Sequence, residues 1–356
     1  MRVALVGPPQ SGKSTLFAAV AEAGGSHVDI HRPDQPHLAV VKVPDDRLTW
    51  LAEQDKPKKV TFAELEFLDL PGLDLSDEAG RSRARAYWAE MQQSNMLVFT
   101  VREFEDPAVP MYRERVDPAA DVQELLAEML FADLDQATSR IEKLQAAVRK
   151  PTAHRDEQLH ELELMRRLAE ALEAEKPIAE AATSESESKL LRSFAFLSEK
   201  PTLIVLNCAE GSLGSAGPGE IAGLPTQRLS AKIEEELAQL PPEDRAEFLV
   251  DLGLTAPARN VLVRACYQRL GLASFFTMNP NECRAWSVPA GTDAVTAAGQ
   301  IHSDMARGFI RAEVVAYEEL RAAGAMKAAK AAGKVRLEGK SYVVQDGDVI
   351  YFRFNV

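Results

Sequence analysis

The sequence predicts an α/β protein: a domain with a largely parallel sheet, an inserted helical hairpin and a small β-rich carboxyl-terminal domain. Short apolar runs alternate with helix-like stretches up to about residue 116, a rhythm typical of strand–helix–strand units. Residues 117–200 instead carry apolar residues at heptad spacing. The composition changes again to β-rich segments near residue 274. We therefore expect a nucleotide domain formed by 1–116 and 201–273, an insertion at 117–200 and a last domain at 274–356.

Length and composition exclude several classes of protein. The 356 residues leave room for two or three domains of ~100–200 residues each. Hydrophobic residues make up 46% and charged residues 27%, which excludes a mainly disordered chain. No apolar run approaches the ~18 residues of a membrane span, and the first apolar run is too short for a signal peptide. Three widely spaced cysteines indicate neither disulfides nor zinc. We expect a cytoplasmic protein without a membrane partner.

The first element of the chain predicts a phosphate-binding loop. Residues 7–14 read Gly-Pro-Pro-Gln-Ser-Gly-Lys-Ser, which matches G-x-x-x-x-G-K-[ST] between the strand Val3–Val6 and a helix that begins near Lys13. The glycines let backbone N–H groups point at phosphate oxygens, and the helix N-terminus adds its dipole. Lys13 would reach the β- and γ-phosphates, and the Ser14 hydroxyl would bind Mg²⁺. The predicted nucleotide-binding residues here are Gly7, Gln10, Ser11, Gly12, Lys13, Ser14 and Thr15.

A second motif follows the strand Leu65–Leu68. Asp69-Leu70-Pro71-Gly72 has the D-x-x-G arrangement of small nucleotide switches. Asp69 would hold Mg²⁺ through water, and the Gly72 N–H would sense the γ-phosphate. Because D-x-x-G alone is a weak signal, this interpretation depends on the P-loop. We predict Lys13 and Gly72 as catalytic residues and Ser14 and Asp69 as the metal-binding residues.

The region 117–200 predicts two antiparallel helices joined by a turn. Its apolar residues step by 4, 3, 4, 3 and 4 positions through Leu130, Leu134, Ala137, Ile141, Leu144 and Val148. Asp117-Pro118 suits the start, Lys150-Pro151-Thr152 breaks the first helix, and the stepping resumes at Leu162, Met165, Ala169 and Leu172. The region holds 11 Lys+Arg and 18 Asp+Glu, a net charge of −7 out of −13. It fits a solvated helical arm or a docking arm for a partner.

The strand Thr202–Leu206 leads into the predicted base site. Asn207-Cys208-Ala209-Glu210 stands where guanine-specific switches carry Asn-Lys-x-Asp. In that pattern the Asp carboxylate takes both guanine N–H donors and the Lys stem stacks on the ring. Cys208 replaces the Lys, and Glu210 is one methylene longer than Asp, so guanine preference should relax or turn to adenine. Ser230 and Ala231 would belong to the last base-contacting loop.

The carboxyl-terminal region predicts a β-rich domain. Ser341–Val344 and Val349–Phe354 flank an Asp346-Gly347 turn, a pattern that predicts a β-hairpin. The region from 274 onward carries 10 Lys+Arg and 9 Asp+Glu, a net charge of +1, whereas the remainder of the chain carries −14. A local patch for RNA would consist of Arg284, Arg307, Arg311 and Phe309. The alternative is a domain that only packs on the nucleotide domain; no DNA partner is expected.

These motifs together resemble the Obg-like ATPase family, the YchF branch of the translation-factor P-loop NTPases, over residues 1–356. The most telling segments, besides Asn207–Glu210, are Arg284–Trp286, Ala297–Gly299, Ile301–Asp304, Arg307–Glu313 and Tyr342–Val356. The resemblance implies a nucleotide domain interrupted by a coiled-coil hairpin, and a ubiquitin-like β-grasp domain of the TGS type. It also implies ATP hydrolysis at least as good as that of GTP, and association with ribosomes or stress-response machinery, with rRNA as a candidate partner of the last domain.

The chain departs from this family at three places. Pro33 stands where the family has the first-switch Thr, a magnesium ligand, and Met111 stands where it carries a loop His proposed to help catalysis. The second switch keeps Gly72 and Gly80 but has lost other glycines, which restricts its backbone. We therefore expect a divergent member that binds Mg²⁺ and ATP in preference to GTP and hydrolyses ATP slowly. A binding module without turnover and a GTPase are the alternatives.

Overall fold

A computed structural model describes residues 1–23, 34–149, 151, 153–215, 217–241 and 243–355. The chain divides into two compact units: the first comprises Met1–Ala19, His27–Ala39 and Phe67–Gly253, and the second Val20–Ser26, Val40–Glu66 and Leu254–Val356. This division keeps the helical insertion with the P-loop region, and the three predicted domain ranges stay a prediction. Among the described residues, no helix is both long and apolar enough to cross a membrane.

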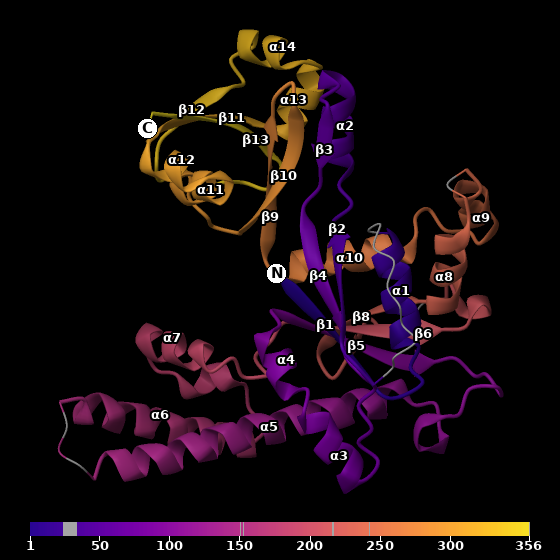
Figure 1. Ribbon diagram of the computed structural model, residues 1–356, viewed down its shortest axis with the longest axis vertical. Helices are drawn as coiled ribbons and strands as arrows, with labels where there is room; N and C mark the ends of the chain where they lie inside the picture. Colours follow the sequence, from indigo (N-terminus) through magenta and orange to yellow (C-terminus); the bar gives the residue numbers. More distant parts are fainter. Residues whose placement is uncertain (24–33, 150, 152, 216, 242, 356) are drawn as a thin grey trace. The chain divides into compact units, whose positions relative to one another are not determined.

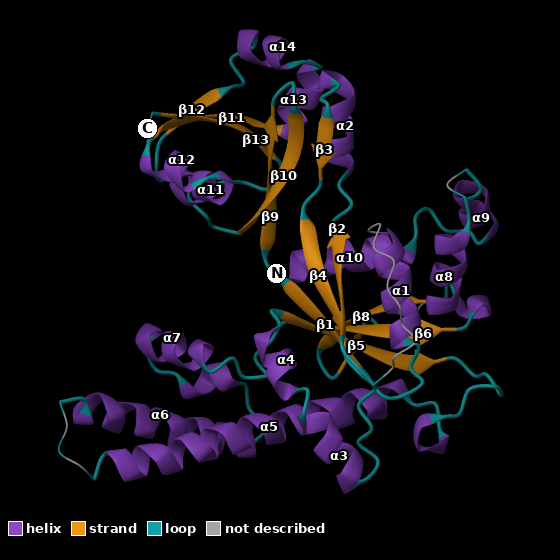
Figure 2. Ribbon diagram, in the orientation of Figure 1, coloured by secondary structure: helices purple, strands orange, loops and turns teal. Residues whose placement is uncertain are grey.

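A seven-stranded sheet, which draws most of its strands from the first unit, has the order β2-β4-β1-β5-β6-β8-β7 (Figure 2). Its strands are β1 (Arg2–Val6), β2 (His37–Lys42), β4 (Glu64–Asp69), β5 (Met96–Glu103), β6 (Thr202–Cys208), β7 (Glu220–Ile221) and β8 (Leu224–Leu229). Strands β1, β5, β6 and β8 pair in parallel, with Val3 opposite Met96 and Leu97 opposite Thr202. The predicted α/β class with a parallel sheet is therefore confirmed.

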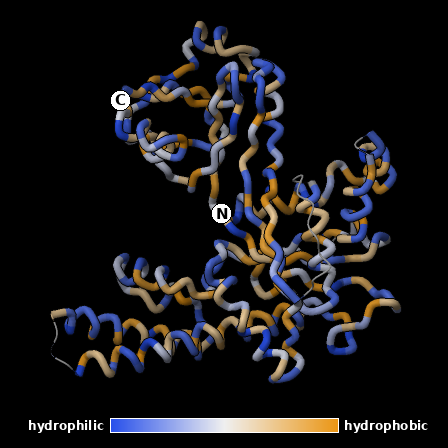
Figure 3. The backbone as a smooth tube through the Cα atoms, in the orientation of Figure 1, coloured by the Kyte–Doolittle hydropathy of each residue, from blue (hydrophilic) through white to orange (hydrophobic). Residues whose placement is uncertain are grey.

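The central strands are apolar on both faces, as in parallel sheets covered by helices. Every residue of β1 after Arg2 is buried, and β6 is buried throughout. Figure 3 shows this sheet largely in the hydrophobic colours. Helices and short 3-10 turns of this part of the chain are α1 (Lys13–Ala23), α3 (Glu78–Arg85), α4 (Trp88–Gln93), η1 (Tyr112–Glu114), η3 (Glu210–Ser212), α8 (Ala231–Gln239) and α9 (Arg245–Asp251). Because β1 lies between β4 and β5, the P-loop, which follows β1, begins at an interior strand of the sheet.

The insertion between β5 and β6 is helical. It consists of α5 (Pro118–Ala147), α6 (Arg155–Glu173), η2 (Ile178–Ala181) and α7 (Glu185–Ser193). Helices α5 and α6 lie side by side (Figure 1) and share one apolar cluster. Of the six heptad residues, Ala137 and Leu144 are buried in it, and the other four, including the C-cap residue Val148, pack against it partly buried. In α6 the cluster takes up Leu168 rather than the predicted Ala169. Asp117 caps α5 by accepting a hydrogen bond from the Ala120 N–H (3.0 Å), and Pro118 takes the first helical position.

The second unit contains a six-stranded sheet in the order β12-β11-β13-β9-β10-β3. Its elements are α2 (Asp46–Asp55), β3 (Lys59–Thr61), α10 (Ala258–Arg269), β9 (Leu272–Met278), β10 (Glu282–Pro289), α11 (Ala294–Ile301), α12 (Ser303–Arg307), β11 (Phe309–Ala316), α13 (Tyr317–Ala323), α14 (Met326–Ala331), β12 (Arg336–Glu338) and β13 (Asp348–Phe354). Three alanines of α11 are fully buried in one cluster with Phe275, Ile350 and Phe352 of the sheet. The TGS assignment of this domain stays a prediction.

The predicted hairpin of Ser341–Val344 with Val349–Phe354 is wrong. Strand β13 pairs antiparallel with β11 and parallel with β9 instead. The earlier segment bonds to the loop before α11, where the Tyr342 carbonyl accepts from the Ala294 N–H (2.8 Å) and the Val344 N–H donates to the Thr292 carbonyl (2.9 Å). The Asp-Gly pair does form a turn, but these longer-range bonds decide which strands it connects.

Candidate nucleotide-binding site

The loop between β1 and α1 is held by two glycines that leave no room for a side chain. A Cβ on Gly7 would lie against the carbonyl oxygen of Thr100, and one on Gly12 would lie against Nδ2 of Asn207, both inside the 3.0 Å that real Cβ atoms keep. Gly12 also has a φ of +82°, which favours glycine. The fixed glycines of the motif are therefore required by close approach of neighbouring atoms.

These residues surround a hollow of about 360 Å³, at the lower end of the usual range of small-molecule sites of ~300–1,000 Å³. Its lining consists of Pro8, Pro9, Gln10, Ser11, Gly12, Lys13, Ser14, Thr15 and Gly72. The first turn of α1 contributes Lys13, Ser14 and Thr15, so the N-terminus of that helix faces the hollow. Ser11 Oγ is buried and has no hydrogen-bond partner among the residues that the structure describes. The hollow therefore offers donors and a helix N-terminus to an anion.

The Lys13 ammonium lies at the base of this hollow. Lys13 is buried, and its Nζ lies 2.5 Å from Oδ1 of Asp69 and also donates to the Leu70 carbonyl. Burial lowers the pKa of Lys13 below 10.5, while the neighbouring Asp69 carboxylate opposes that shift. A phosphate would offer this ammonium a second, stronger partner, because it brings more negative charge than one carboxylate.

The other oxygen of Asp69 faces a residue that the sequence analysis missed. His37, the first residue of β2, places Nδ1 4.0 Å from Oδ2 of Asp69. That nitrogen is buried and has no hydrogen-bond partner in the described part of the chain, and the ring lies 6.4 Å from the ring of Phe17. No local pattern marks His37, because its position depends on how β2 joins the sheet.

The second switch segment packs directly on the P-loop. A Cβ on Gly72 would touch Pro9 at about 3.0 Å, and the Leu73 N–H donates to the Gly7 carbonyl at 2.9 Å. Gly80 is required as well, since a Cβ there would overlap the Asp74 carbonyl. The glycine-poor remainder forms α3, whose N-cap Asp77 accepts from the Gly80 N–H at 2.6 Å. The two remaining glycines are thus fixed by packing.

The predicted base loops meet at Asn207. Its Nδ2 donates to the Ser11 carbonyl and its Oδ1 accepts from the Ala231 N–H, both at 2.9 Å, so this buried amide joins the P-loop to the start of α8. Ser230 caps α8 by accepting from the Ile233 N–H at 3.5 Å. Cys208 is buried, which raises the pKa of its thiol, whereas Glu210 is exposed in η3. Neither Cys208 nor Glu210 lines the hollow of the P-loop.

The oxygen atoms near the P-loop fit Mg²⁺. Ser14 is half-buried beside the hollow and Asp69 is buried below it, and both offer the hard oxygen ligands that Mg²⁺ prefers. Within the described ranges, no group of three His, Cys, Asp or Glu side chains forms a ready metal cage. This is the pattern of a Mg²⁺ that is shared with substrate phosphates. Pro33, at the expected position of the first-switch ligand, lies outside the described residues.

The predicted RNA patch is wrong in one of its members. Phe309 is 6% exposed and packs against Phe352, so it offers no face for base stacking. Arg307 pairs with Asp304, and the guanidinium of Arg284 lies 3.9 Å from the ring centroid of Trp286. Trp286 itself is partly buried against the cluster around α11.

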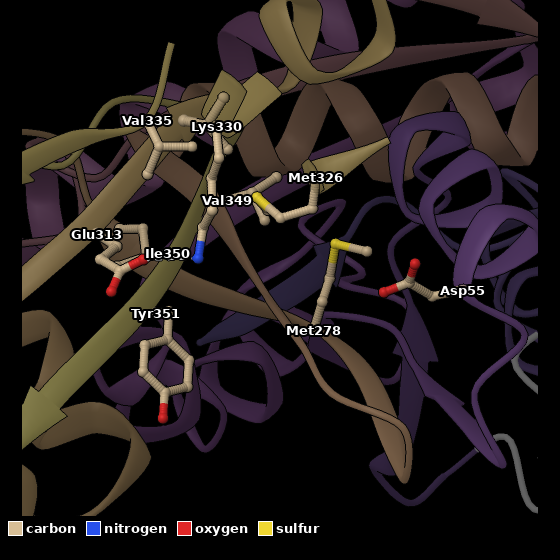
Figure 4. A pocket seen from close by; sticks show the side chains of 10 residues that line it. Asp55, Met278, Glu313, Met326, Lys330, Val335, Val349, Ile350 and Tyr351 are labelled. Carbon is tan, nitrogen blue, oxygen red and sulfur yellow. Dashed lines mark ion pairs between the residues drawn. The ribbon is translucent and has the colours of Figure 1, made fainter. Parts of the chain in front are cut away.

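A separate cavity of about 210 Å³ lies within the second unit (Figure 4). Most of its lining is apolar, including Met278, Met326 and Tyr351, and the Glu313 carboxylate pairs there with the Lys330 ammonium at 3.1 Å. None of its lining residues is a glycine, so it offers no phosphate-binding loop. Its chemistry therefore does not suit a nucleoside triphosphate, and the P-loop hollow is the candidate site.

Comparisons with known families agree with this geometry. A family model described as "50S ribosome-binding GTPase" matches residues 2–138, and the YchF-GTPase carboxyl-terminal model, described as a protein of unknown function, matches residues 272–355. The "Ribosome-binding ATPase YchF" of Bacillus subtilis is 39% identical over 364 residues, covering 99% of this chain and 98% of that protein. The "Obg-like ATPase 1" of Oryza sativa is 31% identical and covers 100% and 92%, respectively.

Solved structures show the same relationship. The YchF GTPase of Schizosaccharomyces pombe superposes with a TM-score of 0.85 at 27% identity, covering 99% of this chain and 97% of that one. A GTP-binding protein of Pyrococcus horikoshii superposes with a TM-score of 0.58 at 17% identity over the full length of both chains. The second likeness concerns the fold alone.

Proposed function

The chain belongs to the family of ribosome-binding YchF and Obg-like ATPases, and from this premise we propose that it is a Mg²⁺-dependent ATPase that prefers ATP to GTP, hydrolyses it slowly and acts as a ribosome-associated switch in the cytoplasm. The observation that carries the proposal is the P-loop hollow, where the buried Lys13 ammonium lies beside Asp69 at the N-terminus of α1. Lys13, Ser14, Asp69 and Gly72 would then be the central residues of the site.

Binding would exchange the partner of Lys13. When phosphate oxygens enter the hollow, the ammonium moves from the Asp69 carboxylate to the phosphates, and Asp69 becomes available on the metal side together with Ser14. The Ser11 hydroxyl and the N-terminal amides of α1 add donors to the same phosphates. Bound Mg²⁺ would supply electrostatic stabilisation of the charge that develops on the phosphate oxygens.

The proposed preference for ATP comes from the base loops. Asn207 is fully engaged in holding Ser11 and Ala231, so discrimination is left to Cys208 and Glu210. A cysteine has no long stem to cover the base, and the longer Glu210 side chain would misplace its carboxylate for the two guanine N–H donors. Both changes remove contacts that favour guanine, and neither adds a new contact to that base.

Slow turnover follows from the missing catalytic side chains. Leu73, 1% exposed within the core, stands next to Gly72 where other switches place a water-orienting Gln, but this is normal for the family and does not by itself make turnover slow. Met111, at the position of the family's loop His, has no group that accepts or donates a proton. A binding module without turnover is the second candidate, and Met111 and the glycine-poor second switch favour it as well.

Calorimetric titration with ATP and GTP, with and without Mg²⁺, tests the proposed binding. We expect ATP to bind more tightly than GTP, both to require Mg²⁺, and Lys13→Ala to abolish binding at the concentrations that saturate the wild type. Restoring the guanine pattern with Cys208→Lys and Glu210→Asp together should shift the preference toward GTP. Tighter binding of GTP by the wild-type chain would overturn the assignment of the base site.

Co-sedimentation with purified ribosomal subunits tests the proposed partner. The description of the matching family model names the large subunit, so that subunit is the first candidate. We expect binding that depends on whether ATP or ADP is present, because a switch must distinguish the two. Equal binding to the ribosomal subunit with ATP and with ADP would contradict a switch. No binding to either subunit with either nucleotide would contradict a ribosomal partner. The assignment of rRNA contacts to residues 274–356 belongs to this proposal too.

A further inference from the structure

Two hydrogen bonds attach Leu75, in the segment between Gly72 and α3, to the loop after β5. The Leu75 N–H donates to the hydroxyl oxygen of Tyr112 at 3.1 Å, and the Leu75 carbonyl accepts from Nη2 of Arg113 at 2.9 Å. The side chain of Leu75 is 1% exposed and belongs to the main apolar cluster of the first unit. Both backbone groups of one switch residue are thus bound by neighbouring residues of another loop.

These two side chains are in turn held by α5. The Tyr112 hydroxyl donates to Oε2 of Glu124 at 2.9 Å, and Arg113 Nε donates to the same oxygen at 3.2 Å, while Arg113 Nη2 also pairs with Oε1. Glu124 lies in the second turn of α5, the long helix of the insertion. Burial, helped by the Glu124 carboxylate, raises the pKa of Tyr112 to about 12, so its hydroxyl keeps its proton near neutral pH. The contact is therefore charge-assisted on the Glu124 side.

The backbone angles of the loop after β5 indicate that contacts with surrounding residues hold it in this conformation. Arg113 and Glu114 have φ angles of +49° and +54°, the left-handed region that costs ordinary residues energy. Two consecutive residues of this kind persist only where surrounding contacts fix them. The contacts to Leu75 and Glu124 are such contacts, and they exist only when Arg113 is turned toward the switch segment.

A second contact links the same two elements. Arg81 of α3 places Nε 3.0 Å from Oε1 of Glu128, one turn further along α5 from Glu124. The switch segment therefore meets α5 at two points, one before α3 through Leu75 and one within α3. Glu128 is 8% exposed, whereas the Arg81 side chain is 39% exposed, so only the carboxylate end of this pair is shielded from water.

We propose that Tyr112, Arg113 and Glu124 are positioning residues of the second switch: they hold Leu75, keep Gly72 facing the P-loop hollow, and tie the switch to the helical insertion. We call these three residues the Leu75 clamp. The role of the Leu75 clamp in turnover rests on the proposed ATPase function, whereas the hydrogen bonds that form the clamp do not depend on that function. Because Glu124 holds both clamp side chains, a partner that moves α5 would alter the position of Gly72, and a bound nucleotide would alter α5.

Hydrogen exchange of the Leu75 amide in the nucleotide-free protein tests the clamp directly. Tyr112→Phe removes the acceptor of that amide, and we expect its exchange to accelerate by about three- to tenfold, as loss of one net hydrogen bond implies. Glu124→Gln weakens the hydrogen bonds that α5 contributes to the clamp, and we expect it to accelerate the exchange of the Leu75 amide as well. Arg140→Lys is the matched control, because Arg140 makes an equivalent pair with Glu161 (2.6 and 2.8 Å) that joins α5 to α6.

Steady-state ATPase kinetics then separate positioning from structure. We expect Tyr112→Phe and Glu124→Gln to lower kcat about three- to tenfold with KM unchanged, and Arg140→Lys to leave both unchanged. Unchanged exchange of Leu75 in both clamp variants, at unchanged melting temperature, would refute the clamp. Accelerated exchange with unchanged kcat would refute its positioning role. If the wild-type chain bound no ATP while the clamp substitutions still accelerated exchange of the Leu75 amide, the proposed function would fail and the clamp would stand.

Discussion

Replacing Gly12 with alanine should damage the site through Asn207 rather than through the backbone alone. Gly12 has a φ of +82°, and its added Cβ would lie against Nδ2 of Asn207, far inside the 3.0 Å that real Cβ contacts keep. Asn207 would have to move, with loss of its bonds to the Ser11 carbonyl and the Ala231 N–H. At about 0.5–1.5 kcal/mol net for each bond, that loss amounts to about 1–3 kcal/mol. The left-handed backbone adds about 1–2 kcal/mol for alanine.

Gly214 provides a control that separates these two costs. Its φ is +80°, but nothing lies within 4 Å of a Cβ built on it. Gly214→Ala therefore carries the backbone cost alone. The difference between the two variants should equal the cost of displacing Asn207, about 1–3 kcal/mol in unfolding free energy. The comparison of two variants is preferable to one absolute value, because a chain with two compact units need not unfold in a single step.

Urea denaturation followed by far-UV circular dichroism, together with titration of ATP, measures both effects. We expect Gly12→Ala to lower the midpoint more than Gly214→Ala and to weaken ATP binding by about tenfold or more, since about 1.4 kcal/mol corresponds to tenfold. Gly214→Ala should leave ATP affinity unchanged. Equal destabilisation by the two substitutions would refute the role given to Asn207 as the link between the P-loop and α8.

Three further predictions concern other buried groups. Asp69→Asn should destabilise the nucleotide-free protein by about 3–5 kcal/mol, because it leaves the buried Lys13 ammonium without its carboxylate; thermal unfolding measures this, and an unchanged melting temperature would contradict the pair. Hydrogen bonds from Thr183, with help from Arg167, hold the pKa of Glu187 at about 2, below its usual 4.5. The stabilisation that this carboxylate provides is thus present above pH 4.5 and lost as the pH falls toward 2; acid titration of the wild type and Glu187→Gln, which should lack this dependence, checks it. Leu144→Ala, at a site 2% exposed between α5 and α6, should cost about 2–5 kcal/mol by urea denaturation, whereas Leu337→Ala, at a 56% exposed site, should cost far less.

The parts of the fold that were predictable from sequence depend on short-range chemistry. The P-loop needs only a strand, a glycine turn and a helix start in succession, and Asp117-Pro118 supplies both an N-cap and a suitable first helical residue. Heptad spacing likewise locates the contact between α5 and α6, because one helical face repeats along the chain. Each of these signals lies within a few turns of one element.

The parts that were missed depend on residues far apart in the chain. The Asp346-Gly347 turn was recognised, but which strand pairs with β13 depends on β11, which lies more than 30 residues earlier. His37 and the Leu75 clamp could not be predicted, because neither Asp69 nor Glu124 is near its partner in a local pattern. Phe309 was misplaced at an RNA surface because an aromatic residue beside arginines has the same appearance whether its ring is buried or exposed.

Single-turnover release of phosphate from ATP and from GTP, with Mg²⁺ and with Lys13→Ala as the control, tests the central claim most directly. We predict slow release from ATP, slower release from GTP and none from the Lys13 variant, because the binding residues are in place while Met111 supplies no catalytic group and the second switch has lost glycines. Faster release from GTP than from ATP, or unchanged release by Lys13→Ala, would contradict the claim.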